Sequence, residues 1–409
     1  MKNILFLLLL LLCSCDFSSN KKQKSKESVS NNEIYENESS KNDSITEAAK
    51  HIQSFSNEDL PLEIHQISEK EFHTAQSKAP KSDSIPKITN FAQAEKHLKD
   101  IVTFRKDRDW THFPQEIRFR NGTKLDTIYD LLNEIGFAAY FPTEDIVLFE
   151  GGHSSDVSFN LSNGKQTEKV GNPDFVIASP NNKVRLNGFY GGQECVFYFI
   201  QQYKNGQWQK TINLDHIFEK ITTKMLCNLS AFWADDTTLY LAHPNYDEQG
   251  TLGFIHYKII LKPTVSDVAW SDFPAVSFPK KEQTNADNYD SLPALSANQA
   301  RLLLSGLFPD AENFKRVYSV PFSDDFTSVV VAFQQGEHQF STILFNLDKN
   351  NQIIDYLLIA YDEIAESAVF TESVLNKDSI VVRKEFYENV ITFTYEISPK
   401  GEFVLKKVK

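Results

Sequence analysis

Two glycine pairs flanked by titratable side chains are the first places in this sequence where chemistry could occur. Gly151-Gly152 is followed by His153 and Asp156, and Gly191-Gly192 is followed by Glu194. An imidazole and two carboxylates can transfer protons or bind a metal ion when they converge on one point. Glycine pairs between strands are equally typical of turns and bulges. The sequence therefore leaves two interpretations of His153, Asp156 and Glu194: a hydrolytic site, or structural turns.

Carboxylates towards the C-terminus form a second candidate group: Asp355, Asp362, Glu363 and Glu366. A pair of carboxylates can hydrolyse glycosides when the two flank a cleft at a set separation. The spacing of Asp362 and Glu366 is also that of a solvated helix or turn, which we favour because no catalytic signature accompanies them. None of these spacings specifies a metal site, and we expect no cofactor.

A basic and aromatic stretch from Phe104 to Arg120 mixes ring faces with guanidinium groups. Such a surface can bind a carboxylated or phosphorylated glycan. Asp107, Asp109 and Glu116 lie within the same stretch. These carboxylates favour a solvated face whose charges pair with one another.

The charge of the whole chain narrows the class of partner. Its 409 residues include 42 Lys and Arg against 55 Asp and Glu, which gives a formal net charge of −13. Nucleic-acid binding relies on basic surfaces that neutralise phosphates, so we expect no nucleic-acid partner. The hydrophobic fraction of 41% and the mean hydropathy of −0.37 are typical of a folded globular body and exclude a polytopic membrane protein.

The N-terminus carries an export signal. Ile4–Leu12 is an apolar run of nine residues, too short to span a bilayer as a helix. It ends in Leu12-Cys13-Ser14-Cys15, which resembles the lipobox of bacterial lipoproteins. The resemblance implies that residues 1–14 are a signal peptide, that Cys15 is acylated, for example with palmitate, and that the lipid holds the protein on a cell-envelope membrane. The alternative is an ordinary secretory signal with Cys15 a chance thiol.

Two cysteines remain after such processing, Cys195 and Cys227, 32 positions apart. In an exported chain they can form a disulfide. They can also be two separate buried thiols that behave as small hydrophobic residues. No family signature around Cys195 specifies a catalytic nucleophile, so the sequence leaves these two interpretations.

Strands must position most of these residues. Residues 15–90, rich in Ser, Asn, Lys and Glu, are expected to form a disordered tether. Residues 91–262 predict a β-rich domain with short helices, one of them over Leu125–Ile135. A polar linker at 263–290 then leads to a second domain, 291–409, in which a helix precedes a β-meander.

The predicted fold class is therefore mainly β with a few helices. The first domain is expected to be an antiparallel sheet or sandwich, and its strand–turn–strand segments, such as Phe175–Leu186, loosely resemble the inner strands of β-propeller blades. The second domain is expected to be smaller. Whether the two together form one propeller-like unit is left open by the sequence.

Several Asp-Ser or Asp-Thr pairs are followed by an aliphatic residue, and these tripeptides resemble the acceptor for O-glycosylation of exported proteins in Bacteroidota. The accessible ones are expected in the tether and the linker. The candidate O-glycosylation sites are therefore the hydroxyl groups of Ser44, Ser84 and Ser291.

The layout of lipobox, polar tether and β-rich body resembles the cell-envelope lipoproteins common in Bacteroidota. That resemblance implies envelope residence, with the protein facing the periplasm or the surface, and no activity. We therefore expect a membrane-anchored binding or scaffolding module for an envelope protein, peptide or glycan. The alternatives are an envelope hydrolase built around His153, Asp156 and Glu194, and an immunity or inhibitor protein whose acidic surface suits a basic target.

Overall fold

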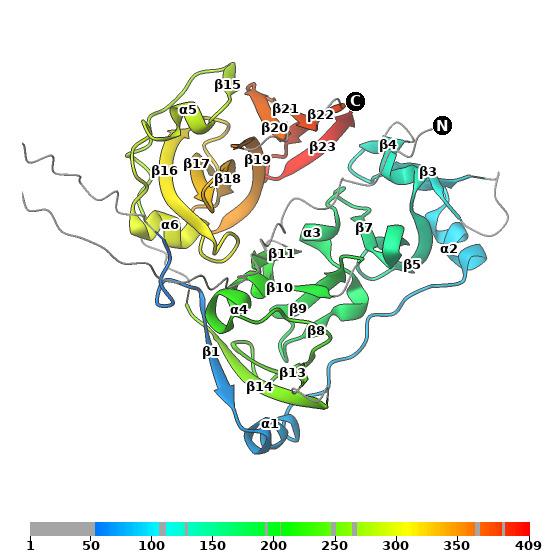
Figure 1. Cartoon of the computed structure of the whole chain (residues 1–409). Coiled ribbons are helices and arrows are strands. Elements are labelled where there is room, and N and C mark those ends of the chain that lie inside the picture. Colours follow the sequence, from blue (N-terminus) through cyan, green and yellow to red (C-terminus); the bar gives the residue numbers. More distant parts are fainter. Residues whose placement is uncertain are drawn as a thin grey trace, which may run out of the picture. The chain divides into compact units, whose positions relative to one another are not determined.

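Antiparallel strands are the main regular structure of the protein (Figure 1). The structure, a computed structural model, describes residues 54–105, 112–126, 130–192, 195–204, 206–246, 251–263, 268–364, 369–386 and 389–409. The strands within these ranges form five antiparallel sheets. The expectation of a mainly β fold with a few helices is therefore confirmed.

Three of the sheets are built from strands that follow one another along the chain, each strand pairing with the next. The first two have three strands each, and the third has four. They consist of β2 (Val102–Phe104), β3 (Pro114–Arg118) and β4 (Lys124–Asp126); β5 (Gly136–Phe141), β6 (Ile146–Glu150) and β7 (Asp156–Asn160); and β8 (Ile177–Ala178), β9 (Val184–Tyr190), β10 (Val196–Lys204) and β11 (Gln207–Ile212).

The fourth sheet combines distant parts of the chain. Its successive strands are β12 (Ser230–Trp233), β13 (Thr238–Tyr246) and β14 (Leu252–Leu261), and β1 (Leu62–Ile67) pairs with β14 from Leu62↔Leu261 to Ile67↔His256. Residues 54–90 thus correct the expected extent of the tether, because they contain this strand and a helix. The earlier part of the expected tether, together with the signal peptide, Cys15 and Ser44, lies outside the described residues.

Helix α1 (Glu69–Gln76) shows why this segment orders despite its polar composition. Ser68 caps the helix by accepting a hydrogen bond from the backbone N–H of Glu71. Phe72 is the buried residue of the helix, and its ring lies 5.2 Å from that of Phe232 on β12. One well-placed aromatic side chain therefore docks a helix whose other residues are mostly polar.

The fifth sheet is a long meander in which eight strands pair in chain order. A short ninth strand, β15 (Lys280–Glu282), pairs with β20. The eight strands are β16 (Ala311–Ser319), β17 (Thr327–Gln335), β18 (Gln339–Leu347), β19 (Ile353–Glu363), β20 (Val369–Leu375), β21 (Ser379–Phe386), β22 (Asn389–Ile397) and β23 (Phe403–Val408).

The remaining helices are short. The helix expected at the start of the second part of the chain is present as α6, where Ser296 and Gln299 form a capping box. None of the helices in the described ranges is long and apolar enough to cross a membrane. The α-helices are α2 (Phe91–Leu98), α3 (Thr167–Val170), α4 (Leu214–Thr222), α5 (Ala286–Tyr289) and α6 (Ala297–Leu303), and the 3-10 helices are η1 (Asp130–Asn133), η2 (Gly152–Ser154) and η3 (Pro173–Phe175).

The largest hydrophobic core joins the two parts of the chain that we expected to be separate domains. Phe55 stacks on Phe314 with ring centroids 4.6 Å apart, and both belong to a cluster that also holds Leu186 of β9 and Val331 of β17. The expected linker contributes Phe273 to the same cluster. Residues 52–409 therefore form one compact unit.

Candidate functional site

The residues proposed for hydrolysis do not assemble into a site within the described chain. His153 is exposed, in a left-handed backbone conformation (φ 54°) within η2. Asp156 of β7 accepts hydrogen bonds at Oδ2 from the backbone N–H of Tyr190 (2.7 Å) and from Asn172 (3.0 Å). Burial raises the pKa of Asp156, and its oxygen ties β7 to β9. Glu194 lies outside the described residues.

Metal binding receives no support from the described residues. No group of three or more His, Cys, Asp or Glu side chains in the described ranges is arranged to hold a metal ion. The carboxylates of β19 are used structurally, since Asp362 accepts from the backbone N–H of Ala286 and Glu363 accepts from the hydroxyl of Tyr361. Glu366 lies outside the described residues.

Where it is described, the basic and aromatic stretch pairs its arginines with carboxylates both inside and outside the stretch. Arg118 forms an ion pair with Glu116, and Arg120 contacts Asp145 at 2.8 Å. The section around Asp107 and Asp109 lies outside the described residues.

The two cysteines are joined. Cys195, directly before β10, and Cys227, after α4, form a disulfide with their Cα atoms 4.8 Å apart. The structure therefore has the first of the two arrangements that the sequence left open.

Two of the candidate O-glycosylation hydroxyls can be inspected. Ser84 and Ser291 are both exposed, as an acceptor must be. The hydroxyl of Ser291 donates to the carbonyl of Asn288 at 2.6 Å.

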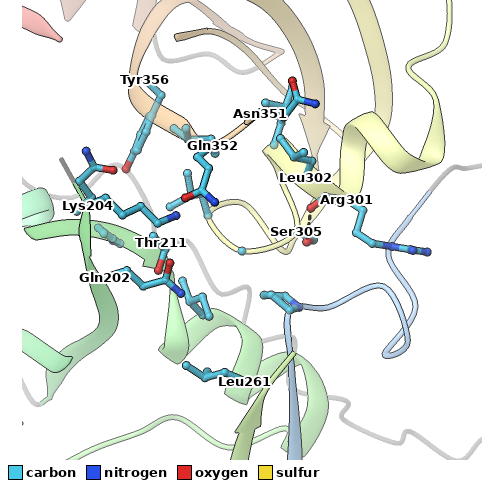
Figure 2. Close-up of a pocket in the computed structure, with 18 of the residues that line it drawn as sticks. Gln202, Lys204, Thr211, Leu261, Arg301, Leu302, Ser305, Asn351, Gln352 and Tyr356 are labelled. Carbon is cyan, nitrogen blue, oxygen red and sulfur yellow. Dashed lines mark hydrogen bonds between the residues drawn. The ribbon is translucent and has the colours of Figure 1, made fainter. Parts of the chain in front are cut away.

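A cleft that the sequence did not suggest is the strongest candidate site (Figure 2). It encloses a cavity of about 230 Å³. One wall comes from α3, the end of β10, and β11. The opposite wall comes from Asn351–Tyr356, where β19 begins, and from Arg301–Leu307 at the end of α6.

Positive charge dominates the lining of this cleft, although the whole chain is acidic. Three lining residues are acidic, namely Glu58, Asp59 and Asp355, whereas six are basic. A cleft with low-dielectric walls and one predominant sign of charge concentrates counter-ions from solution. The basic residues are Lys165, Lys169, Lys204, Lys210, Lys262 and Arg301.

Asp355 pairs with two of these lysines, one of which, Lys165, also lies 3.7 Å from Glu402. The Asp355 carboxylate is buried, 4% exposed, and lies 2.7 Å from Nζ of Lys169 and 4.0 Å from Nζ of Lys165. The backbone N–H of Phe403 also donates to it at 3.1 Å. Burial favours the protonated acid, but the two ammonium groups and the hydrogen bonds outweigh it and hold the pKa of Asp355 below its usual value. This carboxylate is therefore ionised, and its oxygens are occupied by the lysines and the backbone N–H of Phe403.

The ammonium groups of Lys204 and Lys210 have no carboxylate within ion-pair distance among the described residues. Nζ of Lys210 lies 4.9 Å from the centroid of the Phe199 ring, which offers a cation–π contact. Burial lowers the pKa of both lysines, yet both side chains remain partly exposed to solvent. Figure 2 shows Lys204 reaching across the cleft towards Gln352. These two groups are the charges that an anionic ligand could neutralise.

A buried polar network fixes the lysine-bearing helix α3 against the sheet of β9 and β10. Gln201 donates to the carbonyl of Lys169 (2.9 Å), and Asn187 donates to the carbonyl of Val170 (2.8 Å). Gly171 follows the helix at φ 73°, and a Cβ there would lie 2.7 Å from the side chain of Asn187. Only glycine fits this end of the helix, and the result is a rigid platform for Lys169.

Little in the sequence could have revealed this cleft. The lysines come from separate segments at 165–169 and 204–210, and their spacing matches no binding motif. The one local signal is that Lys204 and Lys210 lie close to either side of an Asn-Gly turn, which places them near the same end of a hairpin.

Comparison with known proteins does not assign this chain to a family. No family model and no curated protein matches the sequence. Among solved structures, similarity extends to a prolyl endopeptidase from a study of two such enzymes (10% identity, 68% of this chain, 50% of that chain, TM-score 0.16). It also extends to a tail fibre of Staphylococcus aureus phage P68 (9% identity, 75% of this chain, 83% of that chain, TM-score 0.12). The alignment spans half the length of the endopeptidase chain.

Proposed function

We propose that the protein is an envelope lipoprotein whose β-rich body is a binding module, and that the lysine-lined cleft receives an anionic ligand. The observation that carries this proposal is the pair of ammonium groups on Lys204 and Lys210, which border the cavity and form no ion pair with a carboxylate among the described residues. Carboxylates act on them only at longer range, Asp348 on Lys204 and both Glu168 and Asp215 on Lys210. Partly desolvated cations bind carboxylate or phosphate groups more strongly than exposed cations do.

The chemistry of the cleft favours binding over catalysis. Among the residues that the structure describes, the lining contains no His or Cys side chain. Of its acidic residues, Asp355 is neutralised by lysines, and Asp59 is paired with Arg301 at 2.5 Å. A carboxylate held ionised by cations is a poor general base, because its pKa lies far below neutral pH.

Charge removal tests the proposed ligand class. Replacing both Lys204 and Lys210 by glutamine should weaken binding of short polyglutamate or oligogalacturonate by about tenfold or more, because each lost charge-assisted hydrogen bond contributes about 1.5–3 kcal/mol. Isothermal titration calorimetry of the full chain in detergent measures the change. Lys349→Gln is the matched control, since that lysine is 75% exposed.

Wild-type affinity should also fall as salt is raised, because the contacts are ionic. The proposed function fails if neither anion binds the wild-type protein, or if the double variant binds as tightly as the wild type.

Lipidation is tested separately at the N-terminus. In the native host, metabolic labelling with a palmitate analogue should mark the protein and should be lost in Cys15→Ala. Cys13→Ala is the control, because the lipobox resemblance assigns the acyl group to Cys15 and predicts that Cys13→Ala keeps its label. Label that persists in Cys15→Ala would refute the anchor.

A further inference from the structure

The cleft runs along the edge of a strand. Strand β11 is the last strand of its sheet and pairs only with β10 among the described strands. Five consecutive residues of β11, Trp208–Ile212, line the cavity. Neighbouring side chains of a strand point to opposite faces. A cavity on one face of the sheet would contact only every second residue of β11. Consecutive residues can all line one cavity only when that cavity runs along the edge of the strand.

A second strand edge borders the same cavity. Residues Asn351–Tyr356 line it consecutively at the start of β19. On one side β19 pairs with β18 from Ile353 onwards, but its pairing with β20 on the other side is confined to Tyr361 and Asp362. The beginning of β19 therefore has one side without a strand partner among the described residues.

Such edges offer hydrogen-bonding groups that a ligand can use. In an antiparallel ladder, alternate residues direct their N–H and C=O groups away from the partner strand. Because β11 has no strand on its other side in the described structure, the outward-facing groups of Trp208–Lys210 border the cleft. Beyond them the edge is covered, since Gly306 lies against the carbonyl of Thr211 and accepts a hydrogen bond from the N–H of Asn213. A peptide can add to such an edge as a further strand, with the backbone supplying affinity and the side chains supplying specificity.

We propose that the ligand of the cleft is an acidic peptide segment that binds in extended form, as an additional strand along β11. The proposal rests on the proposed anion-binding function and specifies its ligand. In the register of β10 and β11, Lys210 lies opposite Gln201 and Lys204 lies opposite Gln207, so the two lysines point to opposite faces of the sheet. Each lysine would therefore meet carboxylates on a different face of the extended peptide. The cavity of about 230 Å³ is smaller than the roughly 300–1,000 Å³ typical of pockets for drug-sized molecules, which favours a narrow chain.

The decisive probe is backbone methylation of a peptide that repeats Glu-Glu-Val-Val and so carries Glu on both faces of an extended strand. Methylating the nitrogens of one alternate set removes the N–H groups on one side of the strand and keeps every charge. Methylating the other set is the matched control. For the full chain in detergent, we expect one methylated peptide to bind at least about tenfold more weakly than the parent and the other to bind similarly, because only one side meets β11.

A second readout follows the protein backbone. Hydrogen exchange at the amides of Trp208–Lys210 should slow when the parent peptide binds, because strand addition protects edge amides. The Lys204→Gln/Lys210→Gln variant should weaken the parent and both methylated peptides, since all three carry the same charges.

The remaining outcomes show whether strand addition fails alone or together with anion binding. If both methylated peptides bind like the parent with no change in exchange along β11, strand addition is overturned and anion binding stands. The same holds if oligogalacturonate binds and the peptides do not. If neither peptide nor oligogalacturonate binds, both proposals fall.

Discussion

Replacing Asp355 by alanine is expected to lower the free energy of unfolding by about 3 kcal/mol. The substitution removes the carboxylate that pairs with Lys169 at 2.7 Å, whereas Lys165 keeps Glu402 at 3.7 Å, and removing one partner of a buried ion pair typically costs about 3–5 kcal/mol. The lower end of that range applies because both lysines border the cleft and can regain water. Urea denaturation followed by circular dichroism at neutral pH measures the loss.

The control for Asp355 is a carboxylate in an exposed pair. Asp325 lies 3.7 Å from Lys349, and their side chains are 80% and 75% exposed. Its replacement by alanine should change stability by less than about 1 kcal/mol, as is usual for surface pairs. Equal losses for Asp355→Ala and Asp325→Ala would show that Asp355 is no more than a surface charge.

The same carboxylate should make the protein sensitive to acid. Because the folded state lowers the pKa of Asp355, its contribution is complete above the unfolded-state pKa of about 3.9 and is lost as the pH falls through the lower, folded-state value. In Asp355→Asn, the free energy of unfolding should therefore fall less steeply as the pH is lowered than it does in the wild type. An unchanged slope in this variant would contradict the assignment.

Removing the disulfide is expected to have an effect of similar size. Cys195 and Cys227 are separated by 32 residues, and closing a loop of that length restricts the unfolded chain by roughly 3–4 kcal/mol in the chain-entropy description. The double variant Cys195→Ala/Cys227→Ala should lose about that much stability in urea denaturation. Reduced wild-type protein should show a comparable loss.

Reductant also provides the control, because it should have no effect on the double variant. A wild-type denaturation curve that does not respond to a strong reductant would show that the cysteines are unpaired in solution.

The strand pattern was readable from the sequence, but some local assignments were not. The helix predicted over Leu125–Ile135 was wrong: β4 ends at Asp126, and Asp130–Asn133 forms a 3-10 helix. Leu125 and Ile135 are both buried, so their helix-like spacing serves two separate elements that pack into one core. Periodicity records which residues are buried and does not identify the element that buries them.

The end of the tether was misjudged for a related reason. Leu62–His65 alternates apolar and polar residues, as a strand does, but the alternation breaks at Gln66 and the segment is short and surrounded by polar sequence. Its partner β14 lies almost 200 residues further along the chain. No local signal reports a pairing of that kind, because tertiary contact decides whether a marginal strand forms.

The cleft was beyond sequence reasoning because it is created by the packing of distant segments. Lys169 and Asp355 are 186 residues apart, yet their side chains form a 2.7 Å hydrogen bond. Each lysine alone resembles an ordinary surface residue. Only the fold shows that Asp355 pairs with two of them, while Lys204 and Lys210 border the cavity without an ion pair among the described residues.

The pairing of β1 with β14 also has a mechanical consequence. A pull on the N-terminal segment enters the folded body just before β1, where Ser54 bridges to Glu312 and Leu60 is buried in the largest core. A force along the axis of β1 loads its six residue pairs together, so they resist jointly instead of opening one at a time. Under the proposed anchor, such a pull would therefore reach the Ser54–Glu312 bridge and the packing of Leu60 in the largest core before the β1–β14 ladder, so the core and this sheet would bear the load together.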